Sequence, residues 1–487
     1  MLKSFNVKHL PIYNLLFMVA FAFSTQALSA QSAPPDERDR LFQASVSAYQ
    51  AGHYAEAGPP LEKLVRLAPD VFEVQELLGL VYAAQSQDAK ANEHLAKAVR
   101  LKPRDVAARS NLAACYARLG KMDLALEQFS KAVELDPGAF DTNHNLGEAY
   151  VRTGKIAQAI PFLEKAQRII AASSGMDSVR TATYENGYDL SLAYFLGNRL
   201  AEARTSIHDL IKAKDTSELH NLLAEVEEKD GKFVEAANEF EVAAHMDPSE
   251  SNLFDWASEL LLHRTLDPAV EVFKQGVERY PASQRMVVGL GMTLYARGNY
   301  DDAVKSLLRA ADLNPSEPNC YFFLSRAYDS SPQQAEDVIE RFRRFAELQP
   351  KNARALYYYA MSLWKGKRAQ DPGLDLHKIE SLLTQSIALD SKLAEAHLEL
   401  GNLYSDQGKY PEAIPEYKRA IELNSDLADA YYRLGQAYVR TGDKASAQEK
   451  FEVYQKLREQ HLADLEKQRA EIRQFVYAAK DSPSAKP

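Results

Sequence analysis

The sequence predicts an all-α protein built as a row of paired helices, and three observations lead to that prediction. The first is the stretch 394–425, AEAHLELGNLYSDQGKYPEAIPEYKRAIELNS, which has apolar residues three and four positions apart on both sides of Gly408. This spacing predicts two amphipathic helices. Gly408 can take the left-handed conformation that ends the first of them. Neither helix can bury its apolar face alone, so the pair needs neighbours.

The second observation is that this stretch recurs with a period near 34 residues. The proline that follows each second helix, or a serine in its place, stands at Pro69, Pro103, Pro137, Pro248, Pro281, Pro315, Pro350, Ser391 and Ser425. Alignment on these positions gives about twelve copies. A chain of such copies can bury its apolar faces by stacking them.

The third observation is a pair of columns of small residues in the aligned copies. Position 8 is filled by Ser45, Gly79, Ala113, Gly147, Ser191, Ala224, Ala257, Gly291, Ser325, Ala360, Gly401 and Gly435. Position 20 is alanine in ten of the twelve copies, with Val338 and Ile379 as the exceptions. Small residues at fixed points let two helix backbones approach closely, which sets how the helices of a pair cross.

Together these features resemble the tetratricopeptide repeat (TPR) family. The family's marks in the stretch above are Leu400, Gly401 and Tyr404 in the first helix, and Ala413, Tyr417 and Ala420 in the second. The resemblance covers roughly residues 38–454. It implies a right-handed superhelical solenoid of about twelve TPR helix pairs. It also implies that the first helix of each pair lines a concave groove that binds peptides or partner proteins.

Three copies depart from the pattern. The copy around 250–281 lacks the glycine between its helices and is one residue short. Copy nine has the sequence SSPQQ in place of the turn, and copy ten carries an insertion near Gly366–Leu376.

Residues 1–30 are predicted to be a secretory signal peptide. Lys3 and Lys8 give a positive start, 15–23 an apolar core of nine residues, and Ala27 or Ala30 a small-residue cleavage site. The alternative is an uncleaved anchor, although the apolar core is far shorter than the ~20 residues of a membrane span. We therefore expect an exported chain, periplasmic or extracellular, without a membrane span after cleavage.

The remaining chain is predicted to be one long array. Residues 31–39 form a flexible lead-in, 40–170 hold repeats one to four, and 184–454 hold repeats five to twelve. Between them, the polar stretch 171–183 is predicted to be an inserted loop, either a hinge or an ornament without function.

Past the last repeat, helix-forming composition continues over 455–480. Leu457, Leu462, Leu465, Ile472, Phe475 and Val476 form its apolar stripe. We expect a C-terminal capping helix, because solenoids need a cover for the open face of their last repeat. A coiled-coil dimerisation segment is the alternative. Residues 481–487 are predicted to be disordered.

The charge of the chain excludes one class of partner, and the positions of its two cysteines exclude a disulfide between them. The formal charge of −10 becomes −12 without residues 1–30, which contain two lysines and no acidic residue. Such an acidic chain without a basic stripe would be repelled by nucleic acid. The two cysteines, Cys115 and Cys320, are six repeats apart and too distant to pair within the chain, since a disulfide needs Cα atoms within about 7 Å.

Signatures of catalysis and of cofactor binding are missing from the sequence. The eleven histidines are never closer than twelve residues apart, which gives no helical His pair with metal-ligand spacing. Phosphate-binding loops and nucleophile elbows are missing too. Acidic neighbours such as Asp301 and Asp302 begin a second helix, where they favour the helix dipole. We therefore expect no enzyme activity, no metal and no cofactor.

What remains is the predicted groove. The resemblance implies that positions 2, 5, 9, 12 and 13 of each first helix face it. The predicted groove residues in copies seven to ten are Phe254, Met292, Tyr295, Asn319, Phe322, Arg326, Arg354, Tyr357, Met361, Trp364 and Lys365. Aromatic residues, Met and Arg dominate the binding energy of interfaces. The same residues could instead form a packed wall.

The predicted function is that of an exported, non-catalytic scaffold, with a protein or peptide partner bound along the groove. Two alternatives are an envelope glycan or small-molecule binder, whose aromatic residues would stack on sugar rings, and a self-associating structural subunit. The identity of the partner and the oligomeric state do not follow from the sequence.

Overall fold

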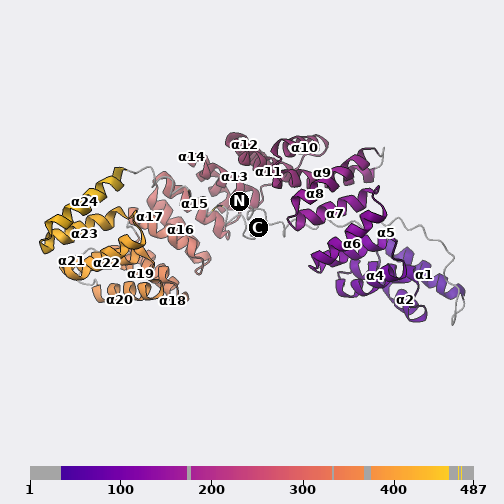
Figure 1. The fold of residues 1–487 in the computed structure, drawn as a ribbon, viewed down its shortest axis with the longest axis horizontal. Coiled ribbons are helices and arrows are strands. Elements are labelled where there is room, and N and C mark those ends of the chain that lie inside the picture. The colour runs from indigo at the N-terminus through magenta and orange to yellow at the C-terminus, as the bar shows by residue number, and fades with distance from the viewer. Residues whose placement is uncertain are drawn as a thin grey trace. The chain divides into compact units, whose positions relative to one another are not determined.

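A computed structural model describes residues 35–172, 177–331, 334–366 and 375–459, together with Ala470, Arg473 and Val476. Within these described residues the chain forms 24 helices and no strand, as Figure 1 shows. The prediction of an all-α solenoid is confirmed. The chain divides into two compact units between Lys232 and Phe233. We call them the N-terminal unit and the C-terminal unit.

The N-terminal unit holds the first eleven helices. They are α1 (Pro35–Gln50), α2 (Tyr54–Leu67), α3 (Phe72–Ala84), α4 (Asp88–Leu101), α5 (Val106–Arg118), α6 (Met122–Leu135), α7 (Phe140–Arg152), α8 (Ile156–Ala171), α9 (Asp177–Leu196), α10 (Leu200–Ala213) and α11 (Ser217–Lys229). Helix α1 begins before the expected first repeat, at a proline, which is well tolerated in the first turn of a helix.

The expected loop over 171–183 is shorter than the sequence indicated. Helix α8 ends at Ala171 and α9 begins at Asp177, so most of the polar stretch is helical. Small polar residues have modest helix propensity, and the packing of the apolar residues further along α9 extends the helix toward its N-terminus.

The C-terminal unit holds the remaining described helices. They are α12 (Phe233–Met246), α13 (Glu250–Leu262), α14 (Leu266–Arg279), α15 (Gln284–Arg297), α16 (Tyr300–Leu313), α17 (Pro318–Ser330), α18 (Ala335–Leu348), α19 (Ala353–Gly366), α20 (Leu376–Leu389), α21 (Ala394–Asp406), α22 (Tyr410–Leu423), α23 (Ala428–Thr441) and α24 (Lys444–Glu459). Of the expected helix over 455–480, the part after Glu459 lies outside the described residues except for Ala470, Arg473 and Val476, which are helical.

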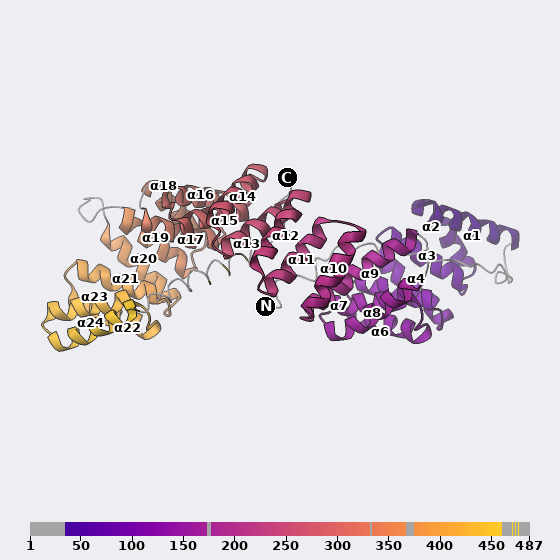
Figure 2. The same cartoon turned by 90° about the horizontal axis from the view of Figure 1, so that it is seen from above.

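Each unit is a stack of helix pairs. Consecutive helices within a unit pack against each other, and most first helices also touch the first helices of adjacent pairs. For example, α15 contacts both α13 and α17, and Figures 1 and 2 show these three helices side by side. The first helices therefore form one continuous layer from α13 to α19, and side chains on its free face share one wall.

The turns inside the pairs use a left-handed residue whether or not a glycine is available. Gly408 has a φ of 74°, as its place after the first helix predicts. In the copy that lacks this glycine, Arg264 takes the same conformation with a φ of 60°. A left-handed residue other than glycine costs roughly 1–2 kcal/mol. The packing of the pair therefore imposes the turn on an unfavourable residue.

The small residues at position 8 mark the closest approach within each pair. A Cβ atom on Gly79 would lie 2.7 Å from Cγ of Leu95 and 3.1 Å from the Leu95 backbone nitrogen. On Gly291 it would lie 2.6 Å from Cγ of Leu307. In both pairs the second helix occupies the space that a larger side chain would fill, as the columns of small residues predict.

Both cysteines are free and buried, as their separation predicts. Among the described residues, none of the helices combines the length and the apolar character that a membrane crossing requires. The signal peptide predicted over 1–30 and the tail predicted over 481–487 lie outside the described residues.

Candidate partner-binding groove

The predicted groove residues lie on the first helices α13, α15, α17 and α19 of the C-terminal unit, but their exposure differs from helix to helix. Phe254 on α13 and Met292 on α15 are 0% and 1% exposed and belong to the apolar core. The ring of Phe254 packs edge-on against Phe273 of the second helix in its own pair, with centroids 6.0 Å apart. These two residues are therefore core residues and offer no open surface.

The wall becomes accessible at α17. Phe322 is half-buried, and the guanidinium group of Arg326, one turn further along the helix, lies 5.1 Å from the centroid of its ring. The ring also packs edge-on against Phe323, with centroids 5.0 Å apart. A half-exposed aromatic ring under a guanidinium group offers both apolar area and a cation–π contact. Asn319 is exposed in the first turn of the same helix.

Helix α19 continues this accessible surface. Tyr357 and Trp364 are half-buried, whereas Met361 between them is 5% exposed. Burial raises the pKa of Tyr357 well above its usual value, and the carboxylates of Glu399 and Asp329 nearby raise it further. At the start of the helix, Arg354 is exposed. The hydroxyl group of tyrosine and the indole N–H of tryptophan usually find a polar partner when they are covered, which suits both residues to an interface.

A charged cluster lies beside Tyr357, and of its members only Lys365 is one of the groove residues predicted from the sequence. Lys365 of α19 donates to the carboxylate of Asp329 on α17. Burial raises the pKa of Glu399 on α21, and the charge of Lys365 opposes that shift. Asn402 donates from Nδ2 to Glu399 Oε2 at 3.0 Å. Asp329 stands at groove position 12 of copy nine, so the same positional rule could have found it.

Tyr295 marks the border between the buried and the accessible wall. It is half-buried on α15, and its ring packs against that of Tyr300 with centroids 5.6 Å apart. We define the open groove as the accessible surface of α17 and α19, formed by Asn319, Phe322, Arg326, Arg354, Tyr357, Trp364 and Lys365.

A hollow of about 820 Å³ lies elsewhere, at the turns that follow α18 and α20. It is lined by residues 349–354 together with Leu389 and Asp390. Arg354 is the only member of the open groove among these lining residues. The hollow is wide open to solvent, so we assign the groove by exposed side chains and not by this depression.

The N-terminal unit presents a different surface on its first helices. Asp141, His144, Glu148 and Arg152 stand at groove positions 2, 5, 9 and 13 of α7. His144 contacts Asp189 of α9, with Nε2 4.0 Å from Oδ2, and Arg152 pairs with Glu148 at 2.5 Å. Burial and the charge of Glu148 raise the pKa of Asp189 to about 7. Four of these five residues stand at groove positions of copy four and could have been found from the sequence. The fifth, Asp189, does not stand at a groove position.

Helix α3 carries a buried carboxyl group at groove position 5. Glu76 is 4% exposed, and burial together with the charge of Asp105 raises its pKa to about 7. Asn111 of α5 donates a long hydrogen bond of 3.3 Å to its Oε1. The sequence alone shows that this copy is acidic. The raised pKa of the Glu76 carboxyl group follows from its burial, which only the structure shows.

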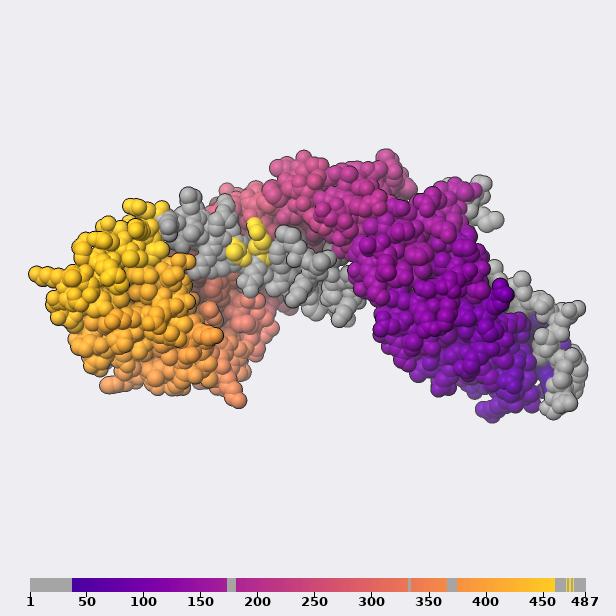
Figure 3. All heavy atoms as spheres, in the orientation of Figure 1, coloured from indigo at the N-terminus to yellow at the C-terminus, as the bar shows by residue number. Residues whose placement is uncertain are grey.

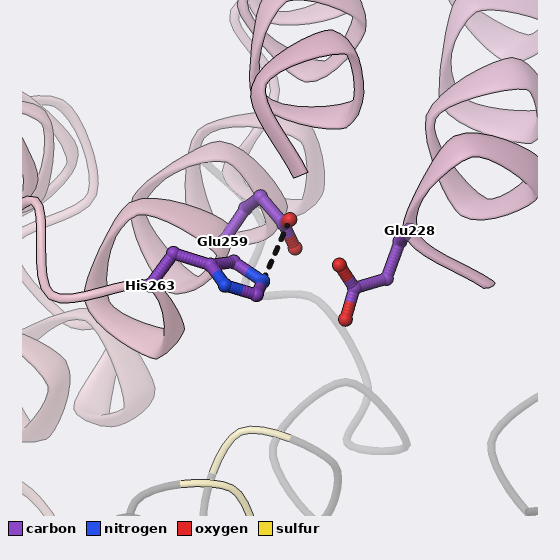
Figure 4. A group of neighbouring side chains, drawn as sticks. All are labelled: Glu228, Glu259 and His263. Atoms are coloured by element: carbon purple, nitrogen blue, oxygen red, sulfur yellow. Dashed lines mark ion pairs between the residues drawn. The ribbon is translucent and has the colours of Figure 1, made fainter. Parts of the chain in front are cut away.

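Two side chains with metal-binding potential lie one turn apart at the C-terminal end of α13, Glu259 within the helix and His263 directly after its last residue. His263 Nε2 and Glu259 Oε1 are 3.2 Å apart and form the ion pair drawn in Figure 4. The ring of Phe233 stacks on that of His263, with centroids 3.9 Å apart. A structural zinc site uses four ligands. Glu259 and His263 alone do not make one, so we assign no metal to them.

Comparison with known protein families identifies the fold. Models described as tetratricopeptide repeat match residues 42–100, 106–138, 140–172, 188–251, 254–318 and 429–461, and a model described as TPR repeat matches 401–442. Together these matches cover well over half of the sequence. The chain belongs to the tetratricopeptide repeat family.

Several solved structures are similar to this chain in fold. The structure of yeast Tom70 is 18% identical, with a TM-score of 0.35, and the match covers 84% of this chain and 95% of that one. A tetratricopeptide repeat protein from Parabacteroides merdae is 14% identical, with a TM-score of 0.38 and coverage of 60% and 99%. A thermophilic TPR protein from Thermus thermophilus is 23% identical, with a TM-score of 0.30 and coverage of 39% and 100%. None of the curated proteins matches this chain. These similarities concern the fold alone.

Proposed function

We propose that this chain is an exported, non-catalytic scaffold that holds an extended or helical segment of a partner protein in the open groove. The observation that carries the proposal is the set of half-buried and exposed Phe, Tyr, Trp, Arg and Lys side chains on the adjacent helices α17 and α19. Among these residue types, Trp, Tyr and Arg are enriched in the hot spots that carry most of the binding energy of protein interfaces. The side chains stand on packed helices, so little conformational entropy is lost when a partner binds.

The charged cluster defines the chemistry of the expected partner. The Asp329–Lys365 pair and the buried Glu399 lie beside the aromatic residues. A partner segment with apolar side chains at helical spacing would cover the aromatic rings, and polar groups at its flanks would meet the cluster. Charged groups at the rim of an interface act mainly on specificity and on the association rate.

The export part of the proposal is supported by the sequence of residues 1–30, which combines two lysines, a nine-residue apolar core and small residues at Ala27 and Ala30. The intact mass of the chain isolated from cells that make it tests this part. A chain that begins after residue 27 or 30 is expected. A mass that includes Met1 would contradict cleavage.

Partner binding is tested by in vivo crosslinking, followed by identification of the attached protein and a binding measurement with the purified pair. The triple variant Phe322→Ala, Tyr357→Ala, Trp364→Ala should weaken binding by at least a hundredfold and keep its helicity. The reason is that large aromatic side chains are often the residues whose truncation costs an interface most of its binding energy. The matched control is Leu313→Ala with Leu348→Ala. These residues are 38% and 53% exposed at the ends of the second helices α16 and α18. Unchanged affinity of the groove variant would refute the proposal.

A further inference from the structure

One buried carboxyl group of the N-terminal unit lacks the kind of partner that its counterparts have. The buried glutamates among the described residues are Glu76, Glu227, Glu250 and Glu259. The last three each lie within 3.2 Å of a basic side chain, and these basic residues are Arg204, Arg285 and His263 in the same order. Such pairing is the usual arrangement, because a charge buried without a partner is costly. Glu76 is the exception.

The contacts of Glu76 leave its carboxyl group without a counter-ion. It is 4% exposed and stands at groove position 5 of α3. The neutral side-chain amide of Asn111 on α5 donates to Oε1 at 3.3 Å, which is long for a hydrogen bond. Within the part of the chain that the structure describes, no basic side chain pairs with this carboxyl group, and its second oxygen accepts no hydrogen bond.

This arrangement makes the N-terminal unit less stable than it could be. Burial raises the pKa of Glu76 to about 7, so near neutral pH the group must either keep its proton or carry an unpaired charge. A glutamine of the same shape would avoid that cost. A buried titratable group that costs stability on the inner wall of a binding protein is a candidate functional group.

The wall beside Glu76 has room for a side chain from another molecule. Groove positions 2, 5, 9 and 12 of α5 hold only small residues, which are Ala107, Ser110, Ala114 and Ala117. The same positions of α17 hold an amide, an aromatic ring and two charged side chains. Helices α3 and α5 contact each other, and the indigo and purple atoms in Figure 3 show these first repeats packed directly together. A long side chain can therefore lie across α5 and reach Glu76.

The charged neighbours of Glu76 favour a cation in that place. Glu73 on the same helix and Asp105, the N-cap of α5, both raise its pKa through their negative charge. The one nearby lysine, Lys102, acts in the opposite direction. Its Nζ atom, however, lies 2.8 Å from Oε1 of Glu73 and is already paired there. Three carboxyl groups thus face a single lysine, and an anionic ligand would be repelled.

We propose that Glu76 receives a lysine or arginine side chain from a partner segment that lies along α3 and α5. The cation forms the ion pair that the other buried glutamates already have. Asn111 holds the carboxyl group in place, and the small residues of α5 give the incoming side chain its room. This second binding surface lies in the N-terminal unit and does not depend on the proposed function of the open groove.

The test uses short fluorescein-labelled peptides of alanine and serine that differ only in their central residue, measured by fluorescence anisotropy with the full-length chain. The central residue is arginine, lysine, citrulline or glutamate. Citrulline has nearly the shape of arginine but no charge. The arginine and lysine peptides should bind at least tenfold more tightly than the citrulline peptide, because they pair with a buried charge. Equal affinity of the arginine and citrulline peptides, or no binding of either cationic peptide, would overturn the proposal.

A matched pair of variants assigns the binding to Glu76. Glu76→Gln removes the charge and keeps the shape, and it should weaken binding of the arginine peptide by at least tenfold. Glu134→Gln removes the same charge from an exposed position on the second helix α6 and should leave the affinity unchanged. Circular dichroism shows that both variants are folded. Equal affinities of the two variants would overturn the proposal.

The pH dependence of binding separates this role from a merely structural one. The affinity for the arginine peptide should rise about tenfold from pH 6 to pH 8, because a carboxyl group with a pKa of about 7 must lose its proton to form the ion pair. The charged and titratable groups that face Glu76 are Tyr49 of α1, Glu73, Lys102 and Asp105. Glu76→Gln should remove the pH dependence and so assigns it to this residue and not to its neighbours. A flat profile in the parent chain would contradict the proposal.

The triple variant of the open groove keeps the two binding surfaces apart. It should bind the arginine peptide as tightly as the parent chain does, whether or not it still binds the protein partner of the open groove. A tenfold loss of peptide affinity in that variant would place the peptide in the open groove and overturn the proposal.

Discussion

Two glycine-to-alanine substitutions in the C-terminal unit should change stability by different amounts because their surroundings differ. Gly291 on α15 and Gly276 on α14 are both buried inside helices. Alanine is favoured over glycine inside a helix by about 1 kcal/mol. Without steric conflict, both substitutions would therefore stabilise the unit.

The steric conflict is severe at Gly291 and mild at Gly276. A Cβ atom on Gly291 would lie 2.6 Å from Cγ and 2.9 Å from Cδ2 of Leu307. Cγ is the branch point of a fully buried side chain, so the two helices must separate. A Cβ atom on Gly276 would meet Sδ and Cε of Met286 at 2.6 and 2.8 Å. These atoms end an unbranched, flexible side chain that can turn aside.

Overpacking in a tight core costs roughly 1–3 kcal/mol. We take the upper half of that range for Gly291→Ala, which leaves a net loss of about 1–2 kcal/mol after the helix gain of about 1 kcal/mol. For Gly276→Ala the two effects nearly cancel. In a unit of this size the loss lowers the melting temperature by about 3–6 °C, whereas Gly276→Ala should shift it by less than about 2 °C.

Thermal unfolding followed by circular dichroism measures both variants, and hydrogen exchange of α15 and α16 locates the effect. Amide protection in these two helices should fall in Gly291→Ala, because each repeat is stabilised chiefly by its nearest contacts. A Gly291→Ala chain that melts at or above the parent temperature would refute the claim that position 8 sets the approach of the two helices.

Three further predictions concern titratable groups. The folded-state pKa of Glu76 is raised to about 7, so its contribution to stability is fully present below its unfolded pKa and is lost as pH rises through 7. Glu76→Gln should therefore stabilise the N-terminal unit by about 1–3 kcal/mol at pH 8 but not at pH 4, and equal effects in thermal melts at both pH values would contradict this. Glu227 behaves in the opposite way, because two hydrogen bonds from Arg204 lower its pKa, so this stability is lost as pH falls. Arg204→Ala should destabilise the unit by about 2–4 kcal/mol at pH 7, with a smaller loss at pH 3; a loss that does not depend on pH would argue against the ion pair. Finally, Cys115 and Cys320, with pKa values of about 11 and about 12, should resist alkylation at pH 8 until the chain is denatured, and rapid labelling of the native chain would disprove their burial.

The sequence predicted the repeating unit well because its causes are local. The apolar spacing around Gly408, the small residue at position 8 and the turn after the first helix all act within one pair of helices. The left-handed turn even recurs at Arg264, where no glycine marks it. Helix boundaries were less accurate: packing extended α9 back to Asp177 through a stretch that the sequence indicated to be a loop.

The groove was predicted less completely because exposure is not a local property. Phe254 and Phe322 occupy equivalent positions in their repeats, and only the tertiary structure shows one in the core and the other at the surface. The cluster of Asp329, Lys365 and Glu399 joins three helices, and the raised pKa of Asp189 depends on burial between α7 and α9. Such contacts depend on how repeats stack.

By itself, the sequence determined that this protein is a stack of helix pairs, because the period of a helix and the period of the repeat both appear directly in the spacing of residues. Only the tertiary structure decided which part of its inner wall is open. The reason is physical: the burial of a side chain depends on what packs over it, and the guanidinium group of Arg285, from the next repeat, lies 4.9 Å from the centroid of the Phe254 ring.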